Sequence, residues 1–338
     1  MGDRPLFPKL SFFFLIHSKT WSVPFYTFYT FYIFLFLNSS FIYSQVPEVE
    51  ATLLHEFNSL DARQGVAVNA THVFSINNSS ITMHDKSAGE SVLQWAGEPN
   101  ADGEKLIHLD SGMVKDGLLY TAHSNYPDSP MSSSIEILNA NTLEYVDSFS
   151  FGVLLGSLTW LDFHQDHWWA TFANYDLVHP GESQPYGTTA ATTLVKMDNE
   201  FNILQQWLFP EILHSRFTPM SNSGGSWGAD GFLYITGHDH PEVYVLQIPE
   251  LGSEVHWLAT VKVPWIEGQG IAWDRTTESR VMWGISRSEE KVFSFSIPDI
   301  LQPRRLSSHF FLKVFTSFNY NYFLFSLSGI SFKPTTCI

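Results

Sequence analysis

The segment Gly237-His238-Asp239-His240-Pro241 holds the densest run of side chains in the chain that can bind a metal or move a proton. Imidazole and carboxylate groups are ligands for divalent cations, and Asp239 could instead orient one of the two rings from outside the coordination sphere. A polar loop that ends at Pro241 and caps a strand would have the same composition. The sequence therefore predicts His238, Asp239 and His240 as a tentative metal site, with a divalent cation as the candidate cofactor.

His108 and Asp110 form a second candidate pair because they stand two residues apart. On an extended chain, residues at this spacing point to the same side. The imidazole and the carboxylate could then bind a cation together or act as base and acid. Asp110 also stands shortly before Gly112, where it could simply cap a turn, and this alternative stays open.

These residues lie between short strands that repeat along the chain. Within Gly268–Pro298, Gly270–Trp273, Arg280–Ser286 and Val292–Ile297 are short, largely apolar or alternating runs separated by polar turns, which is typical of β-strands. Four earlier units contain four such strands each, and turn-forming residues recur in the first hairpin. These units span Gln64–Trp95, Gly112–Phe149, Leu158–Phe209 and Gly225–Val263.

Four-stranded units of this length are typical of β-propeller blades. The fifth unit lacks an outer strand, and Ala51–Phe57 is a strand without a hairpin partner. Pairing the two would close a ring and remove a free edge. The sequence therefore predicts an all-β fold, a β-propeller of five blades with four antiparallel strands each, closed by the N-terminal strand. Six blades remain an alternative, and a β-sandwich is disfavoured because it would not explain the repeated turn order.

One face of such a ring is expected to hold the ligand. In a propeller, the loops that lead into the first strand of each blade and the loops that join its second and third strands lie on one face, around the axis. Polar residues recur at these positions. The candidate ligand-binding residues are His108, Asp110, His123, Asn125, Asn174, Glu267, Gln269 and Arg287. The catalytic residues, if any exist, stay unknown.

The two ends of the chain differ from its middle. Residues 1–45 place basic residues before an apolar run of about 19 residues, which fits a signal peptide or a signal anchor, with cleavage and retention equally open. Residues 46–303 are assigned to the propeller and residues 304–338 to an unstructured or aberrant tail. We therefore expect a secreted or membrane-anchored protein whose propeller lies outside the cytoplasm. The candidate glycosylation sites are Asn69, Asn77 and Asn78.

The charge distribution narrows the range of partners. All acidic residues except Asp3 lie in residues 46–303, in a chain whose formal net charge is -16. Such a surface repels phosphate backbones, so no nucleic-acid partner is expected. The single cysteine, Cys337, allows neither an internal disulfide nor a cysteine-ligated metal. The expected partner is a small molecule, a glycan or a protein at the ring face, and a membrane would be met only through the N-terminal segment.

In its repeats, most clearly Gly268–Pro298 and Ser221–Ile248, the chain resembles the β-propeller superfamily, which includes secreted lactonase-like and quinoprotein-like propellers. The resemblance covers roughly residues 51–300. Resemblance to the lactonase-like members implies an axial divalent cation held by Glu, Asn and Asp. The comparable positions here are Asn125, Asn174, Asp239 and, as the nearest Glu, Glu267. We expect a protein that binds a ligand or protein partner at this face without catalysis, and a metal-dependent hydrolase, lactonase or isomerase is the alternative.

Overall fold

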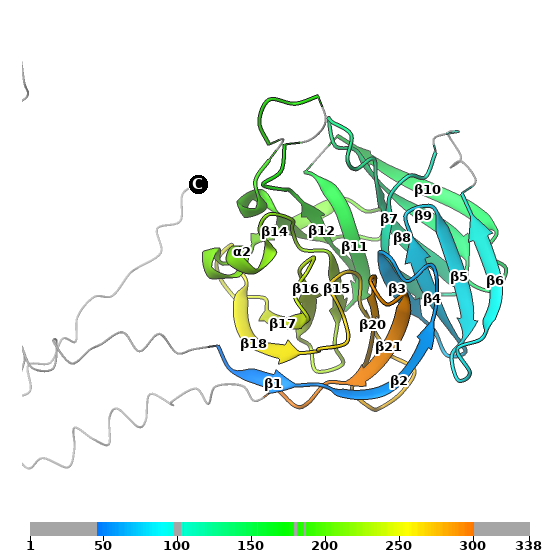
Figure 1. The fold of residues 1–338 in the computed structure, drawn as a ribbon. Coiled ribbons are helices and arrows are strands. Elements are labelled where there is room, and N and C mark those ends of the chain that lie inside the picture. The colour runs from blue at the N-terminus through cyan, green and yellow to red at the C-terminus, as the bar shows by residue number, and fades with distance from the viewer. Residues whose placement is uncertain are drawn as a thin grey trace, which may run out of the picture. The chain divides into compact units, whose positions relative to one another are not determined.

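The computed structural model of the protein describes residues 46–97, 103, 105–153, 155–178, 181–185 and 187–300. In this part of the chain, five β-sheets stand around a common axis (Figure 1). Each sheet contains four antiparallel strands, and one sheet has a fifth, parallel strand in addition, so the predicted five-bladed β-propeller is confirmed and the six-bladed alternative is not. The expectations for residues 1–45 and 304–338 concern residues outside this description.

In each of the first three blades, the strands follow one another in chain order from the axis outward. The first blade consists of β3 (Gly65–Val68), β4 (His72–Asn77), β5 (Ser80–Asp85) and β6 (Ser91–Ala96). The second consists of β7 (Leu109–Lys115), β8 (Leu118–Ser124), β9 (Ser133–Asn139) and β10 (Tyr145–Gly152). The third consists of β11 (Ser157–His164), β12 (His167–Ala173), β13 (Thr193–Met197) and β14 (Ile203–Leu208). The strand positions match the sequence prediction to within a few residues.

The last two blades share the N-terminal segment. The fourth blade consists of β15 (Gly224–Trp227), β16 (Leu233–Thr236), β17 (Glu242–Gln247) and β18 (His256–Lys262). The fifth consists of β19 (Ala272–Trp273), β20 (Val281–Ser286), β21 (Lys291–Ser296) and β2 (Thr52–Asn58). The pairing of β2 with β21 is antiparallel, so the predicted closure of the ring by the N-terminal strand is confirmed.

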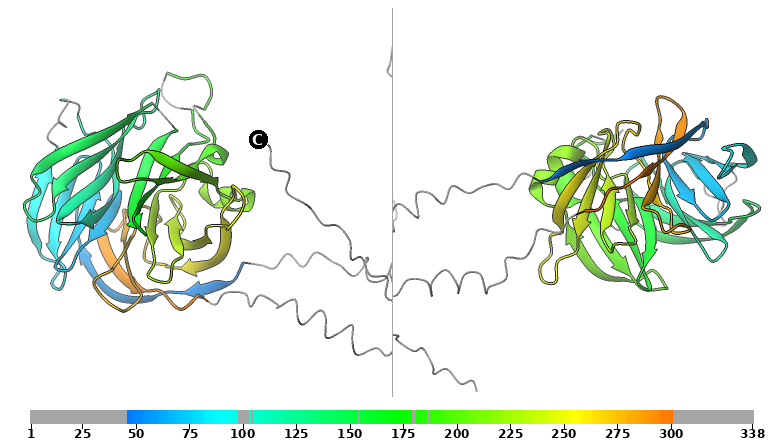
Figure 2. Two further views of the ribbon diagram at one scale, coloured as in Figure 1. Left: turned by 180° about the vertical axis from the view of Figure 1, so that it is seen from behind. Right: turned by 90° about the horizontal axis from the view of Figure 1, so that it is seen from below.

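A short strand, β1 (Glu48–Glu50), extends this closure to a second blade. It pairs in parallel with β18, as a fifth strand of the fourth blade. Figure 2 shows the N-terminal segment running along the outer edges of both blades. The sequence did not predict β1, because three residues are too few to show an alternating pattern. The N-terminal segment therefore covers two neighbouring sheet edges that would otherwise be free.

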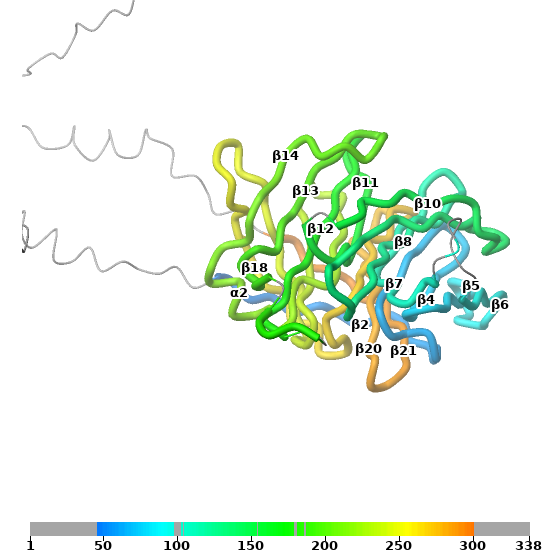
Figure 3. Tube along the Cα trace, turned by 90° about the horizontal axis from the view of Figure 1, so that it is seen from above, coloured from blue at the N-terminus to red at the C-terminus, as the bar shows by residue number. Residues whose placement is uncertain are grey.

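The innermost strands β3, β7, β11, β15 and β19 form a closed ring, since each contacts the next and β19 contacts β3. Two of these strands, β7 and β11, are labelled near the middle of the trace in Figure 3. Gly65 on β3 and Gly270, just before β19, show how tightly they pack. A Cβ atom on Gly65 would lie 3.1 Å from the Cα of Gly270, and one on Gly270 would lie 2.7 Å from the Cα of Gly65. Glycine at these positions allows the innermost strands to approach closely around the axis.

The hydrophobic core lies between neighbouring blades and is rich in tryptophan. Between the third and fourth blades, Trp160, Trp169 and Trp227 are buried together with apolar residues of β13 and β16. The rings of Trp169 and Trp227 meet edge to face at 4.8 Å. Large aromatic side chains bury much apolar area each, which makes these contacts the main force that holds blade against blade.

The loop between β12 and β13 and the loop between β14 and β15 contain the only helices among the described residues. These are η1 (Thr189–Ala191) and α2 (Glu211–Phe217). Leu213 and Phe217 of α2 are buried, and Arg216 forms an ion pair with Glu242 at the start of β17. Neither helix is long and apolar enough to cross a membrane. The helix α2 instead fixes the loop that leads into β15.

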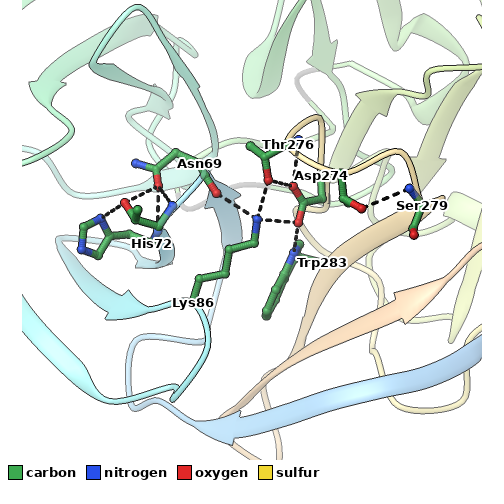
Figure 4. Close-up of polar contacts among 9 residues, drawn as sticks. Asn69, His72, Lys86, Asp274, Thr276, Ser279 and Trp283 are labelled. Atoms are coloured by element: carbon green, nitrogen blue, oxygen red, sulfur yellow. Dashed lines mark hydrogen bonds and ion pairs between the residues drawn. The ribbon is translucent and has the colours of Figure 1, made fainter.

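The seam between the first and fifth blades is held by polar contacts (Figure 4). Lys86, which follows β5, places its Nζ 2.7 Å from Oδ2 of Asp274, which follows β19. The same Nζ donates hydrogen bonds to the carbonyl of Asn69 and to Oγ1 of Thr276. Trp283 donates its indole N–H to Asp274 as well. Blade one is thereby tied to blade five on the face that carries the first hairpins.

Candidate functional site

The opposite face of the ring carries a cavity of about 330 Å³ at the axis, which we call the funnel cavity. Its walls come from all five blades, through the loops that lead into the innermost strands and the loops between the second and third strands. The predicted residues that line it are His108, Asp110, His238, Gln269 and Arg287. Residues distant in the sequence thus meet on one face, as the propeller geometry predicts.

Asp110 and His108 face each other at the floor of the funnel cavity. The Oδ2 atom of Asp110 lies 3.6 Å from Nε2 of His108 and is buried without a hydrogen-bond partner among the described residues. Burial raises the pKa of Asp110 well above its ordinary value, although the charge of Arg287 opposes this. Burial, helped by His123 and His238, lowers the pKa of His108 to about 4. His108 and Asp110 are therefore placed as in an ion pair, but burial favours the neutral form of each group at neutral pH.

Arg287 reaches the cavity from the loop between β20 and β21 and is positioned by His238. Its Nη1 donates to Nε2 of His238 at 3.2 Å, while Nδ1–H of His238 donates to Asp239 at 2.5 Å. Because that nitrogen carries the proton, its 3.4 Å approach to Nη2 of Arg287 is a contact and not a second hydrogen bond. Burial and the charge of Arg287 lower the pKa of His238, so the neutral tautomer required by these bonds is favoured.

Two tyrosines that the sequence reasoning did not select form an aromatic wall of the cavity. The ring of Tyr126 lies 4.9 Å from that of His108 and 5.1 Å from that of Tyr175. Burial raises the pKa of Tyr175, which keeps its hydroxyl protonated. Both residues follow the second strand of their blade, the same position that led to Asn125 and Asn174. The position after the second strand therefore identifies both tyrosines in the sequence, although they are aromatic.

Gln64 and Asn78, from the first blade, also line the cavity and were not predicted as binding residues. The side-chain amide of Gln64 donates to Oδ1 of Asn78 at 2.6 Å. Gln269, which was predicted, adopts a left-handed backbone conformation with φ of 67°. Its amide donates to the carbonyl of His238 at 2.9 Å. The cavity therefore has amide groups on one side and aromatic groups on the other.

Four predicted ligand-binding residues do not line the cavity. Three of them have side chains that serve the fold. Buried His123 lies within β8, where Nδ1 bonds to Ser134 at 2.9 Å. Asn125 holds its own loop, donating to the carbonyl of Pro130 and accepting from the N–H of Ser132. Buried Asn174 donates to the carbonyl of Leu155 at 2.9 Å. These positions were correct for the face of the ring, but the direction of each side chain depends on loop partners that the sequence does not reveal.

Glu267 lines a shallow pocket next to the funnel cavity, together with Asp239 and Arg287. Its carboxylate accepts the backbone N–H and the hydroxyl of Ser288. Burial acts to raise the pKa of Glu267, but these hydrogen bonds outweigh it and hold the pKa below its usual value. Glu267 is thus an anion whose acceptor sites already have donors.

The candidate cation ligands are not brought together. Among the described residues, no three His, Cys, Asp or Glu side chains are placed to hold a metal ion. His238 donates a hydrogen bond to Asp239 and accepts one from Arg287. The ligand set implied by the lactonase-like resemblance is divided because Asn125 and Asn174 bond to their own loops. The residues present therefore do not fit the axial cation that the resemblance implies.

One stretch matches the Gly-x-Ser-x-Gly pattern of nucleophilic serines, at 224–228. Ser226, its central residue, lies inside β15 instead of at a strand-to-helix turn. It is buried, donates to Oδ2 of Asp162 at 3.0 Å and accepts the N–H of Trp273. The match is therefore a structural contact between blades and not a catalytic elbow.

The three candidate glycosylation sites differ in their surroundings. Asn69 is half-buried, and its Oδ1 accepts the backbone N–H groups of Thr71 and His72. Asn77 is half-buried and donates to Asp61 at 3.3 Å. Asn78 is exposed at the rim of the funnel cavity. A glycan would be accommodated most easily at Asn78.

No protein-family model matches this chain, and no curated protein does. Among solved structures, it is similar to the PQQ-bound form of aldose sugar dehydrogenase from Streptomyces coelicolor, with 12% identity, a TM-score of 0.42, and coverage of 74% of this chain and 82% of that one. It is also similar to hydrazine synthase from Kuenenia stuttgartiensis, with 9% identity, a TM-score of 0.40, and coverage of 74% and 97%. The WD40 β-propeller domain of Doa1 shows 11% identity, a TM-score of 0.38, and coverage of 74% and 97%.

Proposed function

We propose that the protein binds a small polar molecule in the funnel cavity, and that this binding is its function without a chemical step. The observation that carries the proposal is Oδ2 of Asp110, which is buried at the cavity and has no partner in the described part of the chain. An unsatisfied buried polar atom costs roughly 1–3 kcal/mol. A ligand that forms one hydrogen bond with Asp110 would offset this cost.

The size and rigidity of the cavity favour a small molecule over a glycan chain or a protein. Its volume of about 330 Å³ lies at the lower end of the usual range for small-molecule sites, roughly 300–1,000 Å³. The loops around it are held in place by Asn125 and Asn174, so little ordering would accompany binding. Tyr126 and Tyr175 supply apolar contact area, while the polar groups opposite them would set the orientation of the ligand.

The test is a binding screen with the full chain, by ligand-observed NMR. The probes are grouped as polyols, monosaccharides, lactones, carboxylic acids and the matching amides. At least one group should bind, and Asp110→Ala should weaken that binding about tenfold, as expected for the loss of one buried hydrogen bond. Asp166→Ala, in the exposed turn between β11 and β12, is the matched control and should bind as the unchanged protein does. Absence of binding by every group would refute the proposal. Binding whose affinity is the same in Asp110→Ala as in the unchanged protein would also refute it.

Catalysis in the same cavity is the second candidate, and it has its own support. A carboxyl group with a raised pKa beside an imidazole with a lowered pKa is an arrangement of acid and base that can work at neutral pH. It would need no metal ligand set. Lactones and esters that bind should then be hydrolysed, and His108→Gln should abolish turnover while binding persists. Bound lactones and esters that are recovered intact would leave binding as the function.

We further propose that the propeller acts outside the cytoplasm, secreted or anchored by its N-terminal segment. The support is the basic and apolar composition of residues 1–45 and the three glycosylation sequons. Expression in a eukaryotic secretory host tests this. Protein in the medium or on the outer cell surface is expected, whereas a protein confined to the cytosolic fraction would contradict the proposal.

A further inference from the structure

The funnel cavity combines one cationic side chain with one buried carboxyl group, and this pairing restricts the ligand chemistry. We infer that the ligand is a small carboxylate that carries a hydroxyl or carbonyl group on the neighbouring carbon, with Arg287 binding the carboxylate and Asp110 donating a hydrogen bond to the neighbouring oxygen. This inference rests on the proposed binding function of the cavity and names the substrate class for it.

Arg287 is the only Lys or Arg among the described residues that line the funnel cavity. One of its N–H groups donates to His238. The carboxylate of Asp239 lies 3.7 Å from Nη2, which is beyond hydrogen-bond length. A guanidinium group presents five N–H donors in a plane and pairs with carboxylates through two parallel hydrogen bonds. Arg287 therefore retains donors for an incoming carboxylate, while its bond to His238 fixes its orientation.

The neighbouring carboxylates of Glu267 and Asp239 do not occupy the donors of Arg287 that face the cavity. Glu267 accepts two hydrogen bonds from Ser288, and Asp239 accepts the proton of His238. Both carboxylates lie in the adjoining shallow pocket, and neither lines the funnel cavity. They balance the charge of Arg287 from outside the cavity without occupying its inner face.

Asp110 supplies the second half of the recognition. It lines the same cavity of about 330 Å³ as Arg287, so a ligand that fills this cavity lies against both side chains. Its Oδ2 is buried and unpaired within the described residues, and His108 is 3.6 Å away, beyond hydrogen-bond length. As an uncharged carboxyl, Asp110 donates one O–H and does not repel an anion. A hydroxyl or carbonyl oxygen beside the ligand carboxylate would accept that proton.

Gln64, Asn78 and Gln269 complete the recognition without adding charge. The amides of Gln64 and Gln269 already donate to Asn78 and to the carbonyl of His238. These hydrogen bonds hold the wall of the cavity in place. The aromatic rings of Tyr126 and Tyr175 close the other side, which limits the remainder of the ligand to a short apolar chain.

The experiment compares acids with their matched amides, which differ in charge but hardly in shape. The probes are lactate and lactamide, pyruvate and pyruvamide, and propionate and propionamide, with glucose and glycerol as neutral controls. Binding to the full chain is measured by ligand-observed NMR and calorimetry. Each acid should bind at least tenfold more tightly than its amide. Lactate and pyruvate should exceed propionate, because only they offer an acceptor to Asp110.

Variants separate the two contacts. Arg287→Gln should lower the affinity for the acids about tenfold to a hundredfold and leave the affinity for the amides unchanged. Arg63→Gln is the matched control: it removes the same charge from the same face, where Arg63 pairs with Glu290 outside the cavity, and should change binding less than about twofold. Asp110→Ala should remove the preference for lactate over propionate, whereas Asp110→Asn, which keeps a neutral donor, should retain it.

The outcomes distinguish the assignment of a carboxylate ligand from the proposed function of ligand binding in the funnel cavity. Equal affinity for acids and amides, or an effect of Arg63→Gln as large as that of Arg287→Gln, would overturn the carboxylate assignment. Binding of glucose, glycerol or the amides alone, sensitive to Asp110→Ala, would reject the carboxylate class and leave binding at the cavity intact. Absence of binding by all probes, acids and neutral compounds alike, would count against the cavity as a ligand site. Near-UV circular dichroism verifies that each variant is folded.

Discussion

The imidazole of His108 and the carboxyl group of Asp110 stand 3.6 Å apart at the floor of the funnel cavity, and burial acts on them in opposite directions on the pKa scale. The same loss of water removes the charge from both: it lowers the pKa of the base and raises the pKa of the acid. Neutral groups in a polar cavity leave Arg287 as the main local charge. The first two predictions follow from this pair.

His108 makes folding stability depend on pH. Its pKa of about 4 in the folded protein lies below the ordinary value of 6.5, so the folded state binds the proton less readily than the unfolded chain does. The resulting stability is fully present above about pH 6.5 and is lost as the pH falls towards 4. His108→Gln should reduce this loss of unfolding free energy at acid pH by an amount on the order of 1–3 kcal/mol. Urea unfolding between pH 4 and pH 7 measures the loss, and His256→Gln, at an exposed position, is the control for the substitution itself. The same loss in His108→Gln as in the unchanged protein would contradict the prediction.

Asp110 should remain protonated at neutral pH. The infrared difference spectrum between the unchanged protein and Asp110→Asn at pH 7 should contain the carbonyl stretch of an uncharged carboxylic acid. The buried environment disfavours the anion, and no hydrogen bond from a described residue reaches Oδ2 to stabilise it. Asp166→Asn, at an exposed turn, is the control for the substitution. A carboxylate band in the Asp110 difference spectrum would show that the group is ionised.

The ion pair of Lys86 and Asp274 should contribute strongly to closure of the ring. Burial acts to raise the pKa of Asp274, but hydrogen bonds from Lys86 and Thr276 keep it below its usual value. Lys86→Met would leave a nearly buried carboxylate without its cation, and we expect a loss of about 3 kcal/mol in the free energy of unfolding. Lys291→Met, which breaks an exposed pair with Glu56, should cost less than about 1 kcal/mol in the same urea titration. Equal losses in the two variants would show that the seam does not depend on Lys86.

The closing strand β2 should be needed for stability through its inward-facing side chains. Phe57 is half-buried and packs on His84 and Trp283, with ring centroids 4.8 Å and 6.3 Å away. Phe57→Ala should destabilise the fold by about 2–3 kcal/mol. Leu54→Ala, on the same strand but 53% exposed, should change the free energy of unfolding by less than about 0.5 kcal/mol. The prediction fails if thermal and urea unfolding respond alike to the two substitutions.

In a secretory host, Asn78 should carry a glycan in preference to Asn77. The two sequons overlap, but Asn78 is exposed and Asn77 donates a hydrogen bond to Asp61 that a glycan would break. Asn78→Gln should therefore reduce the mass of the protein by one glycan. Ser79→Ala, which removes only the Asn77 sequon, should leave the mass of the glycans unchanged. Peptide mass spectrometry after deglycosylation reads the modified position directly, and a modified Asn77 would contradict the prediction.

The alternating strands and repeated turns of the sequence were sufficient to predict five four-stranded blades and the closing strand. These features are local: the side-chain period of a strand and the turn between two strands are set by neighbours in the chain. The same geometry placed His108, Asp110, His238, Gln269 and Arg287 on one face, where the structure has them. The strand β1 escaped prediction because its three residues are too few to show an alternating pattern.

Tertiary structure alone decided which polar residues are available to a ligand. Asn125 and Asn174 stand at the expected strand ends, yet their amides bond to their own loops, while Tyr126 and Tyr175 beside them line the cavity. The neutral state of Asp110 likewise depends on burial by side chains from other blades. The sequence by itself determined the architecture and the face of the ring, because those follow from local periodicity. The direction of each side chain and its charge were decided by contacts between distant segments, since burial and hydrogen bonding are properties of the assembled ring.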